Sequence, residues 1–359
     1  MSMSRKVVVK INDQGFNART GEILLDAALD QGIAVPHDCR AGQCGTCLVR
    51  LKRGVLLGGD TSQPGLFHAC QAHILSDADI TFEKLPPVGE RRGVVTAIEN
   101  LAPDILGVSI QTERRLRHRP GQYYRVKFRG YPARCFSPAP PFAGRSAANV
   151  AHFHIKIVRG GRVTPNLGSV IALGHKVVLE GPFGAAFFRP GDGRRLVLVA
   201  SGTGFAPIWA VAAASLRTQP EVPLLLIAGA RKLSSLYAVP ALCRLALYPR
   251  ASFIAATEDA DRHAPSEIIR PGTPLDHLPP LLETDLVYAA GSPKLVDAVA
   301  KKAAEVGATF FADAFVANPP EEPTWLESLR QTLALARKGL SASPRLAGNT
   351  AHAHSDDAR

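Results

Sequence analysis

The spacing of the cysteines near the start of this chain constrains its fold more than any other feature. The stretch "DCRAGQCGTC" has the pattern C-x4-C-x2-C, and a fourth cysteine follows after 22 further residues. A [2Fe–2S] cluster needs four thiolates that converge on two irons, and this is the plant-type spacing. Gly42 and Gly45 would let the loop bend round a cluster and bring backbone N–H groups close to it. The candidate metal ligands are Cys39, Cys44, Cys47 and Cys70.

Other uses of these cysteines fit the sequence less well. Zinc sites usually combine two C-x2-C pairs, whereas here the first gap is four residues and no second such pair follows. The start of the chain, "MSMSRKVVVKIND", has too short an apolar run for a signal peptide, so a disulfide framework is the weaker reading. Zinc or reactive thiols remain alternatives. No apolar run reaches the ~18 residues of a membrane-spanning helix, so we expect no membrane partner.

Length and hydrophobic pattern predict three domains. A chain of 359 residues exceeds one ordinary core. Residues 6–12 read as a strand and 22–31 as a helix, and "EKLPPVGERR" over 83–92 reads as a linker. Short strands from Gly93 onward predict an antiparallel β-barrel, and apolar strands alternating with helices from 194 predict a doubly wound parallel sheet. We therefore expect a multidomain chain: an α+β domain over 1–86, an antiparallel β-barrel domain over 87–187, an α/β domain over 188–316, and a linker, short amphipathic helix and disordered tail over 317–359.

The positive charge is concentrated in one segment. The formal net charge is +11, and residues 86–180 alone carry fifteen Lys or Arg against five Asp or Glu. Such a segment could bind nucleic acid, an acidic partner protein or a phosphorylated cofactor. No nucleic-acid-binding motif is present, so we expect no nucleic acid. The cluster at 114–119 and the group Arg125, Lys127 and Arg129 are either a solvated face or a docking patch for an acidic partner.

A glycine-rich turn follows the first strand of the α/β region. In "VLVASGTGFAPI", Gly202, Thr203 and Gly204 come directly after an apolar strand and before an Ala-rich segment of helical character. This context suits a pyrophosphate resting on a helix N-terminus. An ordinary strand-to-helix turn is the alternative, because the third glycine of the dinucleotide fingerprint is missing.

Two stretches resemble known families. "PHDCRAGQCGTCLVRLKRG" with "ACQAHILSDADI" is similar to the plant-type ferredoxin domain, which implies a β-grasp fold; the gap before the fourth cysteine is shorter than usual and suggests a trimmed loop. "ARCFSPAP" resembles the R-x-[YF]-S motif of the ferredoxin–NADP reductase-like superfamily. That resemblance implies that Arg134 pairs with a flavin phosphate, Phe136 packs on the isoalloxazine and Ser137 approaches the reactive flavin nitrogen.

The same superfamily accounts for three later segments. "HIKIVRGGRVT" resembles its second flavin segment, in the version that binds FAD rather than FMN, and "GTGFAP" and "YAAGSPKLV" resemble its nicotinamide motifs, with Ala290 where the family commonly has Cys. "FFADAF" resembles its near-terminal aromatic segment and implies that Phe315 lies near the flavin ring. The implied catalytic residues are Ser137, Thr203 and Phe315. The implied cofactor-binding residues are Arg134, Phe136, Ser137, Ile155, Lys156, Arg162, Val163, Thr164, Gly202, Thr203, Gly204, Arg231, Gly291, Ser292 and Pro293.

Charge near the expected ribose site favours NADH over NADPH. The segment "AATEDADRH" supplies Glu258, Asp259 and Asp261, which would repel a 2′-phosphate. Arg231 and Lys232 in "GARKLSSLY" oppose that conclusion, although this turn resembles NADH-using relatives. We expect NADH as the electron donor.

The domain order is similar to that of reductase components of bacterial multicomponent oxygenases. The resemblance covers residues 6–315 and implies electron transfer from NADH to FAD, then to a [2Fe–2S] cluster, then to a Rieske or di-iron oxygenase component or an intermediate ferredoxin. We expect a cytoplasmic monomer. The alternatives are a reductase for another acceptor, such as a deoxysugar dehydratase, and a redox-sensing interaction protein that uses its cofactors only as sensors.

Overall fold

The computed structural model describes residues 5–61, 63–142, 147–190, 193–259 and 269–315. The helix expected at 325–340 and the rest of the expected tail lie outside the described residues. Within the described part, no helix is long and apolar enough to cross a membrane.

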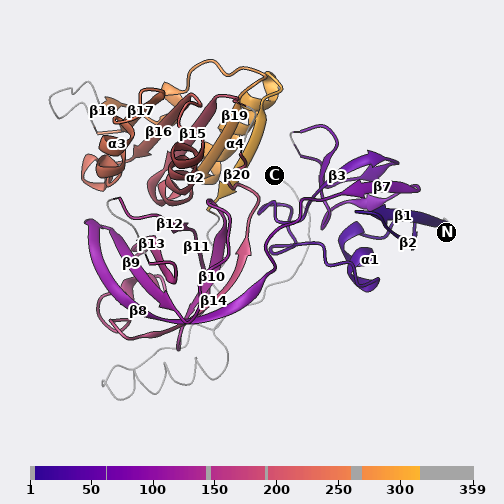
Figure 1. Ribbon diagram of the computed structural model, residues 1–359, viewed down its shortest axis with the longest axis horizontal. Coiled ribbons are helices and arrows are strands. Elements are labelled where there is room, and N and C mark those ends of the chain that lie inside the picture. The colour runs from indigo at the N-terminus through magenta and orange to yellow at the C-terminus, as the bar shows by residue number, and fades with distance from the viewer. Residues whose placement is uncertain (1–4, 62, 143–146, 191–192, 260–268, 316–359) are drawn as a thin grey trace, which may run out of the picture. The chain divides into compact units, whose positions relative to one another are not determined.

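The first domain is a small mixed sheet packed with one helix (Figure 1). Its strand order is β2-β1-β7-β3-β5, with β1 and β7 parallel and the other pairs antiparallel. The expected helix at 22–31 is α1 (Leu24–Asp30), which buries Leu24, Leu25, Ala27 and Ala28. The strands are β1 (Lys6–Ile11), β2 (Gln14–Arg19), β3 (Leu48–Arg53), β4 (Leu56–Leu57), β5 (Leu66–His68), β6 (His73–Ile74) and β7 (Ala78–Thr81).

The second domain is a nearly closed antiparallel sheet with the order β11-β10-β14-β8-β9-β13-β12 (Figure 1). Its two edge strands follow each other in the chain and are separated by the single residue Ser137, so the sheet curls back on itself at that residue. The interior is apolar, with Val126, Phe128 and Phe153 fully buried. The strands are β8 (Gly89–Ala102), β9 (Ile105–Thr112), β10 (Tyr123–Phe128), β11 (Arg134–Phe136), β12 (Pro138–Ala139), β13 (Val150–Lys156) and β14 (Lys176–Phe183).

The expected linker over 83–92 is too long. Strand β8 already begins at Gly89, and Glu90, Arg91 and Arg92 pair with β14. The charges that suggested a linker lie on a strand with no fully buried residue over this stretch, where charged side chains are tolerated. The connection between the first two domains is therefore residues 82–88.

The third domain is a six-stranded parallel sheet with the order β18-β17-β16-β15-β19-β20. The chain moves outward from β15 to β18 and then returns to the other side of β15. Ligands of such sheets bind at this reversal, outside the carboxyl ends of the strands. Its elements are β15 (Leu196–Ser201), α2 (Phe205–Thr218), β16 (Leu224–Ala230), α3 (Val239–Leu245), β17 (Ala251–Thr257), β18 (Ile269–Pro271), β19 (Leu286–Gly291), α4 (Pro293–Glu305) and β20 (Thr309–Ala314).

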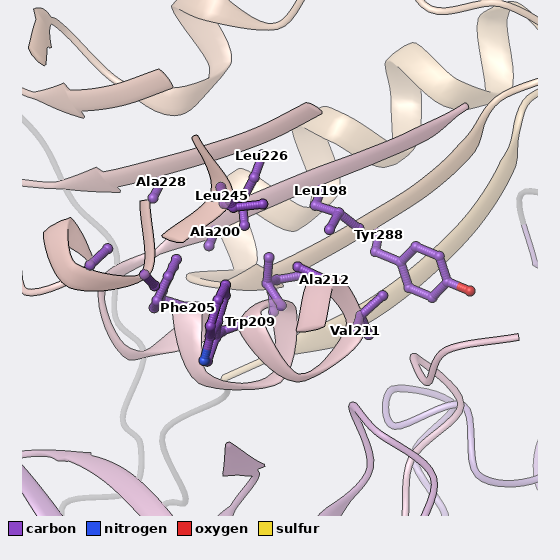
Figure 2. Close-up of a cluster of buried hydrophobic side chains, with 14 of the residues drawn as sticks. Leu198, Ala200, Phe205, Trp209, Val211, Ala212, Leu226, Ala228, Leu245 and Tyr288 are labelled. Atoms are coloured by element: carbon purple, nitrogen blue, oxygen red, sulfur yellow. The ribbon is translucent and has the colours of Figure 1, made fainter. Parts of the chain in front are cut away.

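One apolar cluster spans the junction of the second and third domains. The cluster shown in Figure 2 packs Trp209 and Phe205 of α2 against the sheet, and it continues into Ile105 and Ala139 of the β-barrel domain. Hydrogen bonds cross the same junction. Among them, Trp209 Nε1 donates to the carbonyl of Pro140 at 3.1 Å, and the Tyr288 hydroxyl donates to the carbonyl of Phe187 at 3.1 Å. Among the described residues, the core of the first domain has no member beyond residue 82.

A buried histidine at this junction predicts acid sensitivity. His154 lies 3.2 Å from the Tyr237 hydroxyl, and burial lowers its pKa from 6.5 to about 3. Below pH 6.5, His154 is protonated in the unfolded chain but not in the folded protein. The free energy of unfolding therefore decreases as the pH is lowered, by up to about 1.4 kcal/mol per pH unit. We expect His154→Gln to lose less unfolding free energy than the wild type between about pH 7 and about pH 5 in denaturant titrations. Equal losses in both proteins would contradict the assignment.

Candidate functional site

The cysteine loop directs backbone N–H groups toward a thiol. The Cys39 Sγ atom accepts hydrogen bonds from the backbone of Ala41 and of Cys44, both at 3.4 Å. Arg40 adopts a φ of 55°, which turns the chain sharply after the cysteine. A hydrogen bond from the Cys44 thiol, together with these N–H groups, lowers the pKa of Cys39. The loop therefore favours negative charge on its first sulfur, as thiolate ligation requires.

The four thiols gather as two pairs. Cys39 shares a hydrogen bond with Cys44, and Cys47 shares one with Cys70 in the buried interior of the domain. A zinc ion needs four ligands round one point, whereas a two-iron cluster places two thiolates on each iron. The arrangement fits the predicted [2Fe–2S] cluster better than zinc.

The cysteine loop also contacts the β-barrel domain. Gly45 has a φ of +67°, and a Cβ atom added there would lie 3.0 Å from the Cβ of Ala185. The buried Thr46 hydroxyl accepts the Gly184 N–H at 2.9 Å and the Cys44 thiol at 3.2 Å. The Thr46 hydroxyl thus connects the candidate ligand Cys44 to the barrel segment that follows β14.

The seam of the barrel holds the expected flavin residues. Arg134, Phe136 and Ser137 lie where the two edge strands meet, and the ring of Phe136 packs 6.4 Å from that of Phe153. The Ser137 side chain is buried, and its Oγ donates a hydrogen bond to Asp313 Oδ2 of β20 at 3.3 Å. This bond joins the barrel to the third domain.

Asp313 is a candidate functional residue that sequence reasoning missed. Burial raises the pKa of its carboxyl from 3.8 to about 7, while the hydrogen bond from Ser137 opposes that shift. A carboxyl that exchanges its proton near neutral pH can hold a proton beside the flavin residues. The available signal was an acid inside the aromatic segment "FFADAF".

The second flavin segment contributes less through its side chains than expected. Ile155 and Val163 are 1% exposed and belong to the barrel core, so their side chains cannot touch a cofactor. Lys156 pairs with Asp104 at 3.4 Å, and the Thr164 hydroxyl accepts the backbone N–H of Val158 at 2.9 Å. Contacts from Ile155 and Val163 to a flavin would have to come from the backbone.

The two nicotinamide segments and the near-terminal aromatic segment meet at the carboxyl edge of the parallel sheet. The 3₁₀ turn Gly202–Gly204 ends β15, and Ser201 Oγ accepts the backbone N–H of Ser292 at 3.1 Å. Phe315 donates its N–H to the carbonyl of Gly291 at 2.7 Å. A Cβ atom on Gly204 would lie 2.3 Å from the carbonyl oxygen of Ala290, so only glycine permits this approach. The remaining expected residues of this edge, Thr203 and Pro293, lie in the same two turns.

The expected ribose end combines both signs of charge. Arg231 follows β16 and is exposed, and Asp259 after β17 accepts the N–H of Leu233 at 2.8 Å. Asp261 lies outside the described residues. Asp259 therefore binds the backbone only two residues after Arg231.

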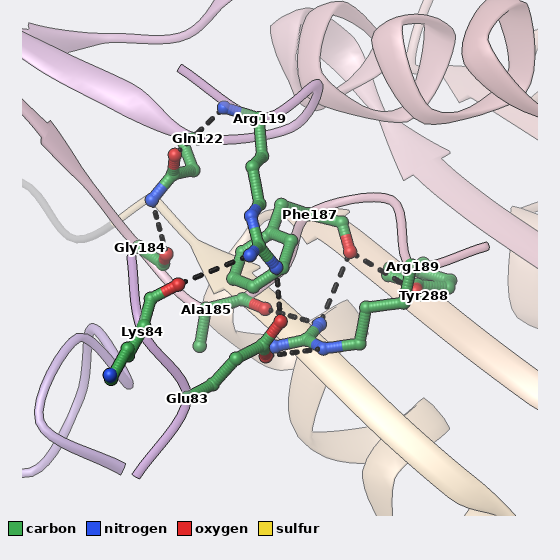
Figure 3. A network of polar contacts seen from close by, with 9 residues as sticks. All are labelled: Glu83, Lys84, Arg119, Gln122, Gly184, Ala185, Phe187, Arg189 and Tyr288. Carbon is green, nitrogen blue, oxygen red and sulfur yellow. Dashed lines mark hydrogen bonds and ion pairs between the residues drawn. The ribbon is translucent and has the colours of Figure 1, made fainter. Parts of the chain in front are cut away.

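Two arginines, Arg119 of the basic segment and Arg189 beyond it, bind the connection between the first two domains. The Glu83 carboxylate pairs with Arg119 and accepts a hydrogen bond from Arg189 Nε at 3.0 Å (Figure 3). Both guanidinium groups also lie over the Phe187 ring, 4.8 and 3.7 Å from its centre. The acidic partner of Arg119 is thus this chain's own connecting segment, whereas Lys127 and Arg129 remain exposed.

Comparison with known families agrees with this arrangement. Residues 9–75 match the 2Fe-2S iron-sulfur cluster binding domain, 93–188 the oxidoreductase FAD-binding domain, and 198–301 the oxidoreductase NAD-binding domain. The chain is 30% identical over 346 residues to the terephthalate 1,2-dioxygenase reductase component 1 of Comamonas, covering 88% of this chain and 99% of that protein. It belongs to the reductase components of multicomponent oxygenases.

Other relatives of this reductase show the same architecture. It is 30% identical to the xylene/toluene monooxygenase electron transfer component of Pseudomonas putida, over 87% of this chain and 94% of that one. The solved ferredoxin reductase in carbazole 1,9a-dioxygenase is 26% identical, with a TM-score of 0.60, covering 88% of this chain and all of that one. The predicted fold and the predicted [2Fe–2S], FAD and nicotinamide cofactors are confirmed, and the chain is an oxidoreductase.

Proposed function

We propose that this reductase takes electrons from NADH and delivers them one at a time to an oxygenase component, directly or through a small ferredoxin. The observation that carries the proposal is a series of contacts in two parts. The first runs from the Gly202–Gly204 turn through Ala290, Asp313 and Ser137 to the barrel, and the second from the barrel through Thr46 to the cysteine loop. Each NADH reduces two one-electron acceptors and yields NAD⁺ and one proton. We further propose a cytoplasmic monomer, because that compartment supplies NADH and keeps thiols reduced.

The flavin and the cluster together would supply the change from a two-electron donor to one-electron steps. Arg134 would pair with the flavin phosphate through its forked donors. Phe136 would cover the ring, and Ser137 would direct its hydroxyl toward the reactive nitrogen. The Ser137–Asp313 pair would hold the proton that accompanies hydride transfer, at Asp313 Oδ2. Phe315 would cover the ring until nicotinamide arrives.

The cysteine loop would hold the cluster through two thiolate pairs. Cys39 and Cys44 would bind one iron, and Cys47 and Cys70 the other, as their hydrogen-bonded pairing suggests. N–H groups aimed at Cys39 would help to offset the negative charge of the sulfurs.

The turn after β15 would bind the NADH pyrophosphate. Gly202, Thr203 and Gly204 precede α2, whose N-terminus favours an anion. Ser292 caps α4 by accepting the N–H of Leu295 at 3.4 Å, which fixes the second turn beside it.

The acids after β17 should make NADH the better donor. We expect Glu258→Arg to raise kcat/KM with NADPH roughly tenfold, the worth of one charge-assisted hydrogen bond to a 2′-phosphate. Glu305→Arg makes the same charge change at the end of α4 and is the control. A wild-type enzyme that used both donors equally, or a Glu258→Arg enzyme with unchanged NADPH kinetics, would contradict the preference.

Reconstitution separates the proposed function from its alternatives. The purified reductase with NADH should support turnover of an oxygenase component, and removal of either protein should stop it. Rapid reduction of a deoxysugar dehydratase but of no oxygenase would favour the alternative acceptor. A fully loaded protein that failed to reduce ferricyanide or cytochrome c with NADH would indicate a sensor instead.

A further inference from the structure

The first domain meets the β-barrel domain through polar contacts. Among the described residues, its apolar core stops at residue 82, whereas one apolar cluster spans the junction of the other two domains. A cleft of about 750 Å³ opens at the meeting point, lined among others by Val35, Pro36, Leu85 and Pro182. Because open space rather than packed apolar side chains fills this place, the polar contacts must hold the cysteine loop against the barrel.

One carboxylate in this cleft is nearly buried and has two barrel partners. Asp38, next to Cys39, has a side chain that is only 5% exposed. Its Oδ2 accepts a hydrogen bond from the Tyr123 hydroxyl, and its Oδ1 pairs with the Arg125 guanidinium. Arg125 also lies 3.5 Å from Glu180, which holds the guanidinium in place from the neighbouring strand. A charged group this far from water is stable only while both partners stay in contact with it.

The two partners come from the strand that leads toward the flavin residues. Tyr123 and Arg125 both lie on β10, and β10 pairs with β11, which carries Arg134 and Phe136. Asp38 is adjacent to the first candidate cluster ligand. The contact therefore joins the loop of one cofactor to the strand beside the other, separately from Glu83, which fixes the connecting segment.

We propose that Asp38 is a positioning residue for electron transfer between flavin and cluster, holding the cysteine loop against β10 through Tyr123 and Arg125. The inference rests on the proposed function. The step that it governs would be the transfer of one electron from bound flavin to bound cluster, in which no bond to Asp38 forms or breaks. Losing the contacts of Asp38 with Tyr123 and Arg125 shifts the equilibrium from the docked to the undocked loop. At any moment, fewer molecules then hold the two cofactors close enough for electron transfer.

The test compares three variants of the whole reductase. Asp38→Asn removes the charge, and Arg125→Gln and Tyr123→Phe remove the partners without substituting a residue of the cysteine loop. Asp13→Asn is the matched control, because Asp13 pairs with Lys10 at 3.2 Å on the surface of the same domain, outside the cysteine loop. For Asp38→Asn and Arg125→Gln we expect a roughly tenfold fall in the stopped-flow rate of cluster reduction by NADH, the effect of losing one charge-assisted hydrogen bond. Iron content and NADH–ferricyanide activity should stay unchanged.

A second readout does not depend on activity. Trypsin can cut after Lys84 in the connection over residues 82–88. Leu85 and Pro86 line the same cleft as Asp38. An undocked loop should therefore loosen that connection, so cleavage there should be faster in Asp38→Asn and Arg125→Gln than in Asp13→Asn.

The outcomes separate this inference from the proposed function. If Asp38→Asn fails to assemble a cluster, Arg125→Gln and Tyr123→Phe decide the question. Wild-type rates of cluster reduction and of cleavage in loaded Arg125→Gln would overturn the positioning role. A wild-type protein without an iron–sulfur spectrum would instead overturn the proposed function.

Discussion

Cys44→Ser should abolish the iron–sulfur absorption and stop electron transfer to cytochrome c, while NADH still reduces ferricyanide through the flavin. Cys44 shares hydrogen bonds with both Cys39 and Thr46, so it lies at the centre of the cysteine loop. A serine hydroxyl does not replace a thiolate as a ligand of an iron–sulfur cluster. The loss should exceed the ~10–100-fold effect of removing an outer-shell partner of a metal site. Iron analysis, visible spectra and the two acceptor assays measure it.

Cys243→Ser is the control for that variant. Cys243 is an exposed cysteine in α3 of the third domain and should be neutral in every assay. Retention of the cluster spectrum in Cys44→Ser would contradict the ligand assignment. Loss of ferricyanide activity as well would show that the variant had damaged the flavin domains.

Gly204→Ala should disrupt both the nicotinamide site and the fold around it. The new methyl group would meet the carbonyl oxygen of Ala290 at 2.3 Å and its carbon at 2.4 Å, and backbone atoms cannot swing away as side chains do. Overpacking of this kind lowers the free energy of unfolding by about 1–3 kcal/mol. Displacing the turn after β15 by about 1 Å would also lower kcat/KM for NADH roughly a hundredfold. Denaturant titration and steady-state kinetics test the two effects.

Gly15→Ala provides the comparison, because a Cβ atom there meets nothing within 4 Å. That variant should keep wild-type kinetics. Flavin content in Gly204→Ala should remain normal, since the barrel binds the flavin. Unchanged stability and NADH kinetics in Gly204→Ala would show that the turn after β15 can move away from Ala290 of β19 at no cost. That result would contradict the close packing seen in the structure.

The hydrophobic patterns of the sequence were enough to predict two of the three folds, whereas the β-grasp fold of the first domain came from its resemblance to plant-type ferredoxins. Apolar strands followed by Gly or Pro turns indicated the barrel, and strands alternating with helices indicated the parallel sheet. The start of β8 was missed because Glu90, Arg91 and Arg92 look like linker residues until β14 is placed beside them. Strand pairing is a long-range property, so local composition cannot reveal it.

The candidate site was predictable where residues form contiguous motifs. Single carboxylates were not: Asp38 and Asp313 gain meaning only when the topology brings them to Tyr123 and Ser137. The basic segment was interpreted as a solvated face or a patch for an acidic partner. Arg119 and Arg125 instead bind Glu83 and Asp38 of this same chain.

The connection over residues 82–88 changes how strong these contacts need to be. A tether this short keeps the first domain within ~25 Å of its anchor, which corresponds to an effective concentration in the millimolar range. Contacts with a dissociation constant near that value would hold the loop in place for much of the time. As two separate proteins at micromolar concentration, the same surfaces would scarcely associate. Because the two domains are covalently joined, weak contacts between them are sufficient. Weak contacts also let the cysteine loop leave the barrel and return to it quickly.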